Sequence, residues 1–126
     1  MARNYNTLEV WQLGYELTLI LYRLTESFPE HEQNNLTSQI RRASTSIPLN
    51  IAEGTSRFTK KSYLQFLQYA YGSIREVQVL IELSKDLGYI KHKSYDDVSE
   101  RIDKLSRKLF VFIKKVEREK FFSWFR

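Results

Sequence analysis

Apolar residues recur every three or four positions in four segments of the chain, as on one face of a helix. In the first segment Val10, Gly14, Leu17, Leu21, Leu24 and Phe28 follow this spacing. The expected inward positions of the later segments are Leu36, Ile40, Ala43, Ile47 and Ile51; Tyr63, Leu67, Ala70, Ile74, Val77 and Ile81; and Val98, Ile102, Leu105, Leu109, Phe112 and Val116. The pattern predicts helices over about residues 7–27, 36–53, 60–87 and 95–122.

Residues typical of helix ends lie between these segments. Pro29 should end the first helix, because the residue before a proline avoids helical backbone angles. The candidates for capping are Thr7, Thr59 and the Ser94–Asp97 pair at N-termini, and Gly54 and Gly88 as the residues after C-termini. Pro48 lies inside the second segment, where it removes a backbone donor and predicts a kink.

Short connections between successive helices make neighbouring helices antiparallel. The chain of 126 residues has only four glycines and two prolines, which favours a few long elements over many short strands. A chain of this length can bury a core as one domain. We therefore predict a single domain over residues 1–126, an all-α, antiparallel up-and-down four-helix bundle with its second helix kinked at Pro48.

The first segment carries a second stripe, which is mostly aromatic. Leu8, Trp11, Tyr15 and Tyr22 lie beside the apolar face of the predicted helix. One neighbouring helix needs only the first stripe. Trp11, Tyr15 and Tyr22 are therefore candidate interface residues, with a second copy of the chain as the expected partner.

Several classes of chemistry lack the residues that they need. The chain has no cysteine, and His31 and His92 fall in predicted loops without a partner at metal-ligand spacing. We expect no catalytic residues, no metal and no cofactor, and a protein that is not an enzyme. Because the N-terminus lacks a signal-like apolar run and no stretch has the length of a membrane span, we expect a cytoplasmic protein with no membrane partner.

The net charge of +5 is concentrated near the C-terminus. Residues 1–100 hold 11 Lys and Arg against 12 Asp and Glu, whereas residues 101–126 hold nine against three. The cations of the fourth predicted helix, Arg101, Lys104, Arg107, Lys108, Lys114, Lys115 and Arg118, are candidate phosphate contacts. The alternative is a solvated face, in which Glu100–Lys104 and Asp103–Arg107 pair at i,i+4 spacing.

The second predicted helix has an unusual polar stripe. Gln39, Arg42, Ser46, Asn50 and Glu53 lie near one face. Such side chains beside a proline can bond freed backbone groups, so we interpret them first as a structural network. The alternative interpretation is a recognition surface.

The segments LTSQIRRASTSIPLNIAEG, LEVWQLGYELTLILYRLTESFP and SYLQFLQYAYGSIREVQVLIELSKDLGYI resemble the four-helix bundle protein family, also called the 23S rRNA intervening sequence protein family. The resemblance covers residues 5–118. It implies a homopentamer, and a related accessory protein of diversity-generating retroelements binds nucleic acid and a reverse transcriptase. The family motif, with a role in binding or assembly, matches Gln39, Arg41, Arg42, Ser46, Pro48, Asn50, Glu53 and Gly54.

Two functions follow as hypotheses. The first is a non-catalytic, oligomeric adaptor that binds RNA or DNA, or a ribonucleoprotein, through the basic face of the fourth helix. The alternative is a protein–protein interaction scaffold without nucleic-acid binding, whose partner docks on the aromatic stripe of the first helix or on the aromatic tail 121–126. We expect that tail to pack against protein, because exposed aromatic clusters favour aggregation.

Overall fold

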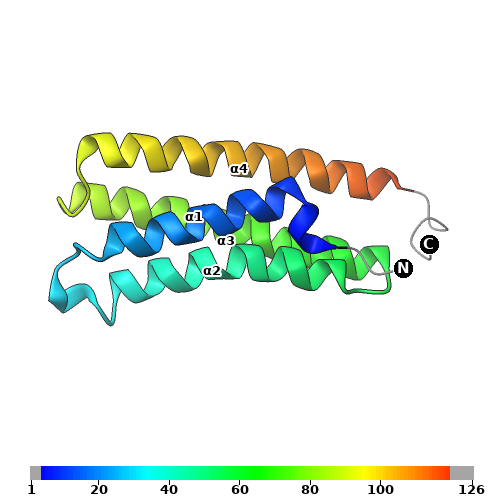
Figure 1. The fold of residues 1–126 in the computed structure, drawn as a ribbon, viewed down its shortest axis with the longest axis horizontal. Coiled ribbons are helices and arrows are strands. Elements are labelled where there is room, and N and C mark those ends of the chain that lie inside the picture. Colours follow the sequence, from blue (N-terminus) through cyan, green and yellow to red (C-terminus); the bar gives the residue numbers. More distant parts are fainter. Residues whose placement is uncertain (1–3, 120–126) are drawn as a thin grey trace.

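The structure, a computed structural model, describes residues 4–119. Within that range the chain forms four long helices and two short 3-10 turns, with no strand (Figure 1). The helices are α1 (Glu9–Thr25), α2 (Leu36–Thr55), α3 (Lys60–Asp86) and α4 (His92–Arg118). The 3-10 turns are η1 (Tyr5–Thr7), before α1, and η2 (Glu30–Glu32), between α1 and α2.

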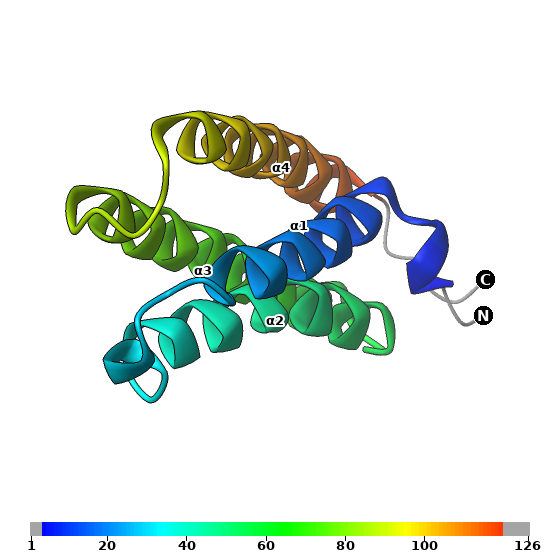
Figure 2. The same ribbon diagram turned by 60° about the vertical axis from the view of Figure 1, so that its left-hand side comes forward.

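The helices form an antiparallel up-and-down four-helix bundle, as the apolar spacing predicted. Each helix packs against the next one along the chain, and α1 and α4 close the bundle with a less extensive contact (Figures 1 and 2). The α1–α2 and α3–α4 connections share one end of the bundle, whereas the α2–α3 connection lies at the other end with the C-terminal end of α4. All expected inward residues of α2 and α3 are buried; in α4, Ile113 is buried and Phe112 only partly so.

Two helix-end predictions are confirmed. The Thr59 hydroxyl accepts a hydrogen bond from the backbone N–H of Ser62, which satisfies one of the free donors at the start of α3. Gly88 follows α3 with a φ of +84°, a left-handed conformation that glycine adopts without steric penalty.

Two N-cap predictions are wrong. The Thr7 hydroxyl donates to the carbonyl of Asn4 inside η1, and α1 begins after Leu8 without a side-chain cap. The fourth helix begins at His92 rather than near residue 95, so Ser94 lies in its first turn. Tyr95 packs against the core, and its backbone N–H donates to the carbonyl of Lys91 at 2.9 Å, the first helical hydrogen bond of α4. At the other end α4 stops at Arg118, and the predicted end at 122 lies outside the described residues.

Gly54 is not a left-handed C′ residue, because α2 continues through it to Thr55. Its role is to let α3 approach. A Cβ at this position would lie 2.9 Å from Cδ1 of Tyr63, a core residue that is 1% exposed. The predicted motif residue therefore acts through close packing rather than through backbone freedom.

Gly14 allows a similar approach between α1 and α2. A Cβ at Gly14 would lie 3.0 Å from Cγ2 of Ile47 and 3.8 Å from Cδ of Pro48. The backbone of α1 therefore passes directly over the turn of α2 that contains the proline. The predicted kink at Pro48 stays a prediction; the proline lies inside one helical segment, Leu36–Thr55.

The carbonyl that Pro48 leaves without a helical donor has a partner in α1. Because proline has no N–H, it cannot donate to the carbonyl of Ser44 four residues earlier. The Thr18 hydroxyl lies 2.9 Å from that oxygen and 2.9 Å from the carbonyl oxygen of Gly14 in its own helix. Thr18 therefore links α1 to the one turn of α2 whose backbone bonding is incomplete.

We predict that Thr18→Val lowers the free energy of unfolding by about 1–3 kcal/mol, the cost of leaving a buried carbonyl unpaired. In a Pro48→Ala background the same change should cost less, because the introduced alanine supplies the missing N–H. Urea unfolding of the four variants measures this coupling. An equal cost in both backgrounds would contradict the assigned role of Thr18.

Candidate functional site

Arg41, a residue of the predicted motif, joins α2 to the C-terminal end of α1. Its Nε donates to Oγ1 of Thr25 at 2.9 Å, and its Nη2 donates to the carbonyl of Tyr22 at 3.1 Å. The guanidinium also lies 4.8 Å from the centroid of the Tyr22 ring. A cation that bonds last-turn carbonyls stabilises a helix C-terminus, so Arg41 has a clear structural role.

The polar stripe of α2 is largely a network. The Ser46 hydroxyl bonds the hydroxyl of Ser73 on α3, and Nδ2 of Asn50 donates to the carbonyl of Ser46 at 2.7 Å. Gln39 bonds Asn35, and Glu53 pairs with Arg57. These contacts fit the structural interpretation of the stripe. Arg42 differs, because it is exposed and makes no hydrogen bond or ion pair within residues 4–119.

Four of the seven candidate cations on α4 have carboxylate partners. Two of them pair across the α1–α4 seam, Arg101 with Glu16 at 2.7 Å and Lys108 with Glu9 at 3.2 Å. The hydrogen bond from Arg101 to Glu16 is the main reason that the pKa of Arg101 is raised. The other pairs lie within α4: Arg101 with Asp97 at 3.3 Å, Arg107 with Asp103 at 3.0 Å and Lys114 with Glu117 at 3.4 Å.

Three cations, Lys104, Lys115 and Arg118, form no ion pair in the part of the chain that the structure describes. The predicted Asp103–Arg107 pair is confirmed, whereas the predicted Glu100–Lys104 pair does not form there. Two hollows follow the α1–α4 seam, of about 330 and 350 Å³. Lys104 lines the first hollow together with the carboxylates of Glu16, Asp97 and Glu100, whereas Lys115 lines the second, where cations outnumber acids.

The candidate interface residues of α1 differ in exposure. Tyr15 and Tyr22 are 48% and 42% exposed, whereas Trp11 is half-buried. The rings of Trp11 and Tyr15 stack with centroids 4.9 Å apart, and Tyr5 meets Trp11 edge-on at 5.0 Å. The result is an ordered aromatic surface on the outside of the bundle.

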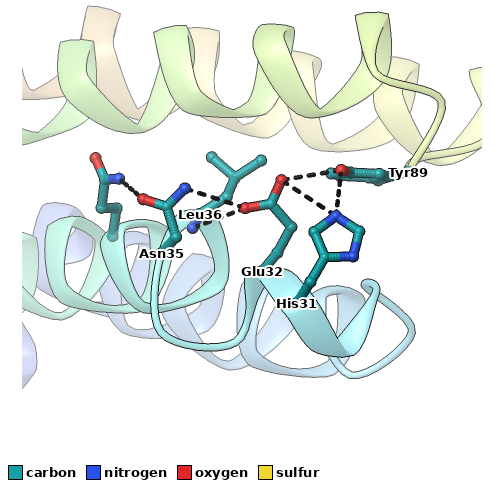
Figure 3. Close-up of polar contacts among 6 residues, drawn as sticks. His31, Glu32, Asn35, Leu36 and Tyr89 are labelled. Atoms are coloured by element: carbon teal, nitrogen blue, oxygen red, sulfur yellow. Dashed lines mark hydrogen bonds and ion pairs between the residues drawn. The ribbon is translucent and has the colours of Figure 1, made fainter.

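A buried carboxylate, Glu32, lies in the connection between α1 and α2, opposite the connection between α3 and α4 (Figure 3). Glu32, 9% exposed, accepts a hydrogen bond from the Tyr89 hydroxyl at 2.9 Å. Its other oxygen faces Nδ2 of Asn35 at 3.2 Å and the backbone N of Leu36 at 3.4 Å, and His31 lies 4.0 Å away. Glu32 thus ties the α3–α4 connection to the start of α2.

These contacts change the pKa values of both partners. The Tyr89 hydrogen bond is the largest cause that lowers the pKa of Glu32; burial opposes it, and Leu36, Asn35 and His31 add to it. The same bond, with burial and the negative charge of Glu32, raises the pKa of Tyr89. Only the i,i+3 spacing to Asn35 hinted at this site in the sequence, because the Tyr89 contact spans 57 residues.

Comparison with known proteins identifies the family. Residues 6–111 match the sequence pattern of the family described as 23S rRNA-intervening sequence protein. The chain belongs to the 23S rRNA-intervening sequence protein family. No protein with a curated description matches it significantly.

The bundle is similar to a solved structure, a protein with unknown function from the S23 ribosomal protein family of Bacteroides thetaiotaomicron VPI-5482. The TM-score is 0.75 at 22% sequence identity, over 83% of this chain and 98% of that chain. This likeness shows the fold. The family match includes the whole α2 motif and ends before Lys114, so the last three α4 cations lie outside the matched residues.

Within residues 4–119, no group of three or more His, Cys, Asp or Glu side chains is arranged to hold a metal ion. None of the helices in the same range is long and apolar enough to cross a membrane.

We predict that Glu32 makes unfolding stability depend on pH. A carboxyl group whose pKa is lower in the folded state contributes stability above its ordinary pKa of ~4.3, and that contribution is lost as pH falls through the folded-state value. In Glu32→Gln the free energy of unfolding should therefore fall less steeply as the pH is lowered, which flattens the acid limb of the pH–stability profile. Tyr89→Phe should have the same effect, because it removes the main cause of the lowered pKa of Glu32. Urea unfolding across the acid range measures it.

The matched control is Glu30→Gln, since Glu30 is an exposed acid in the same turn without an ion pair among the described residues. It should leave the acid limb as in the wild type. An acid limb that is the same in Glu32→Gln and wild type would contradict the prediction.

Proposed function

We propose that this protein is a non-catalytic, oligomeric adaptor that binds nucleic acid, or a ribonucleoprotein, through α4. The observation that carries the proposal is the division of the α4 cations into paired and unpaired groups. Within residues 4–119, Lys104, Lys115 and Arg118 are exposed and form no ion pair. Phosphate contacts made by such side chains supply sequence-independent affinity.

The three cations lie near one face of α4. Lys104 and Lys115 are 11 residues apart, which is close to three helical turns, or roughly 16 Å along the helix. Arg118 lies one turn further. A ligand that contacts all three must therefore be extended along the helix, which suits a nucleic-acid backbone better than a small anion.

The neighbouring helix adds positive charge at the same end of the bundle. Nζ of Lys60, at the start of α3, donates to the carbonyl of Glu119 at 2.7 Å, which places the start of α3 beside the end of α4. Lys61 follows and is exposed. The proposed phosphate surface therefore extends from α4 towards these two lysines.

Self-association would present several copies of this low-affinity surface on one particle. The exposed aromatic residues of α1, Tyr15 and Tyr22, support a proposed interface between copies, and the family resemblance suggests five copies. Linked weak sites bind a long ligand more tightly than one site alone. The proposed location of this activity is the cytoplasm.

A second candidate function is a protein-interaction scaffold. It is favoured by the ordered stack of Trp11 and Tyr15 on the outer face of α1. The partner would be a protein, of which a reverse transcriptase is one class suggested by the resemblance. Protein partners commonly bury such rigid aromatic side chains at interface centres.

We predict that charge reversal of Lys104, Lys115 and Arg118 to Glu abolishes most salt-sensitive RNA binding. Each phosphate contact with a single strand contributes about 0.7 to the slope of log K against log salt, so the slope should fall by about 2. Titration of the protein into fluorescent single-stranded RNA or DNA at several salt concentrations gives the slope. The affinities for RNA and DNA at the same salt concentration show which nucleic acid is preferred.

The matched control reverses Arg75, Lys91 and Lys93, which are exposed cations away from the C-terminal half of α4. Its net charge changes by the same amount, so a general charge effect would weaken binding equally in both variants. That result, or wild-type protein without salt-sensitive binding, would favour the scaffold.

We also predict a mass near five times the chain mass of 15.1 kDa in light scattering of nuclease-treated protein. Tyr15→Glu should lower this mass, because it places a charge in the proposed aromatic interface. A variant at an exposed apolar residue of α3, Val79→Glu, is the control and should keep the oligomer. A monomeric wild type would contradict the proposal.

A further inference from the structure

A polar pocket of about 310 Å³ lies where α1 ends and α2 begins. Its walls include Thr25 and Glu26 from the end of α1, Gln33 from the connection, and Thr37 and Arg41 from the first two turns of α2. This is the end of the bundle opposite the C-terminal end of α4 (Figure 1). The pocket is therefore separate from the proposed phosphate surface on α4.

Arg41 brings a fixed positive charge to this pocket. Its bonds to Thr25 and to the carbonyl of Tyr22 use two of the five N–H groups of the guanidinium and hold it in place. Within residues 4–119 the side chain forms no ion pair with a carboxylate. Three donors and a full charge are left for a ligand, and the side chain loses little further entropy when one binds.

Thr37 supplies a second free donor in the pocket. The residue is only 5% exposed, and its hydroxyl has no hydrogen-bond partner among the described residues. Among the described residues only Nε of Arg57 is a fully buried side-chain polar atom without a partner, so the Thr37 hydroxyl keeps contact with solvent and is free to donate. Thr37 lines the same pocket as Arg41, so a bound group with acceptor oxygens would satisfy both side chains.

We propose that this pocket binds an oxyanion, a phosphate or carboxylate group of a small ligand. Arg41 and Thr37 donate to its oxygens, and the exposed Gln33, whose amide has no partner within the described range, also lines the pocket as a third donor. The volume leaves room for a substituent beyond the anionic group, against the ring of Phe28. Glu26, which also lines the pocket, weakens binding because its carboxylate repels an anion.

The test is an NMR titration of ¹⁵N-labelled protein with inorganic phosphate and, separately, with acetate, against sodium chloride at the same ionic strength. Saturating shifts of the Gln33, Thr37 and Arg41 amides with either probe support the site. Phosphate, with more charge and more acceptor oxygens, should saturate at the lower concentration. The reverse order would assign the site to carboxylates.

Thr37→Val and Arg41→Gln should each weaken binding about tenfold or more, as expected for a lost hydrogen bond to a charged group. Thr37→Val retains the Arg41 bonds to α1, so it tests the site even if Arg41→Gln impairs folding. Glu26→Gln should strengthen binding, because it removes the repelling charge. Arg42→Gln, next to Arg41 but outside the pocket, is the matched control and should bind as the wild type does.

Shifts that spread over all cationic surfaces, or that persist unchanged in Thr37→Val, would overturn the proposal. Equal losses in Arg41→Gln and Arg42→Gln would do the same, because they would indicate a general charge effect. Charge reversal of the α4 cations should leave phosphate binding here unchanged, so the two proposals can fail separately.

Discussion

The close approach of α1 to α2 depends on one backbone oxygen. Pro48 cannot donate to the Ser44 carbonyl, and a buried carbonyl without a donor costs about 1–3 kcal/mol. The Thr18 hydroxyl lies at hydrogen-bonding distance from it, 2.9 Å. This hydrogen bond favours one rotation and one axial position of the two helices, and Gly14 makes the close approach sterically possible.

The polar residues of α2 follow from that arrangement. Once α1 is fixed over Pro48, its last turn lies beside Arg41, which bonds Thr25 and the carbonyl of Tyr22. On the other side of α2, Ser46 meets Ser73. Residues that resemble a recognition motif in the sequence therefore hold three helices in register, and the proposed anion pocket lies where this network reaches the end of α1.

The fourth helix is attached differently. The contact between α4 and α1 is less extensive than the contacts α1–α2, α2–α3 and α3–α4. Two ion pairs, Arg101–Glu16 and Lys108–Glu9, span the seam between α1 and α4. Exposed ion pairs contribute little stability each. Their main consequence is that the α4 cations fall into two groups. The cations that pair with α1 are partly neutralised, so Lys104, Lys115 and Arg118 are better placed to bind an anionic ligand.

The sequence was enough to predict the bundle, because apolar repeats of three and four residues give each of four long segments one helix face to bury. It also determined the Thr59 cap and the Gly88 turn, which depend on local backbone chemistry. Tertiary structure alone decided the role of Gly54, the start of α4 and the Glu32–Tyr89 bond. These features depend on which residues meet across the bundle. Apolar periodicity predicts which face of a helix is buried, but it does not predict which residue of a neighbouring helix lies opposite each position along the bundle axis.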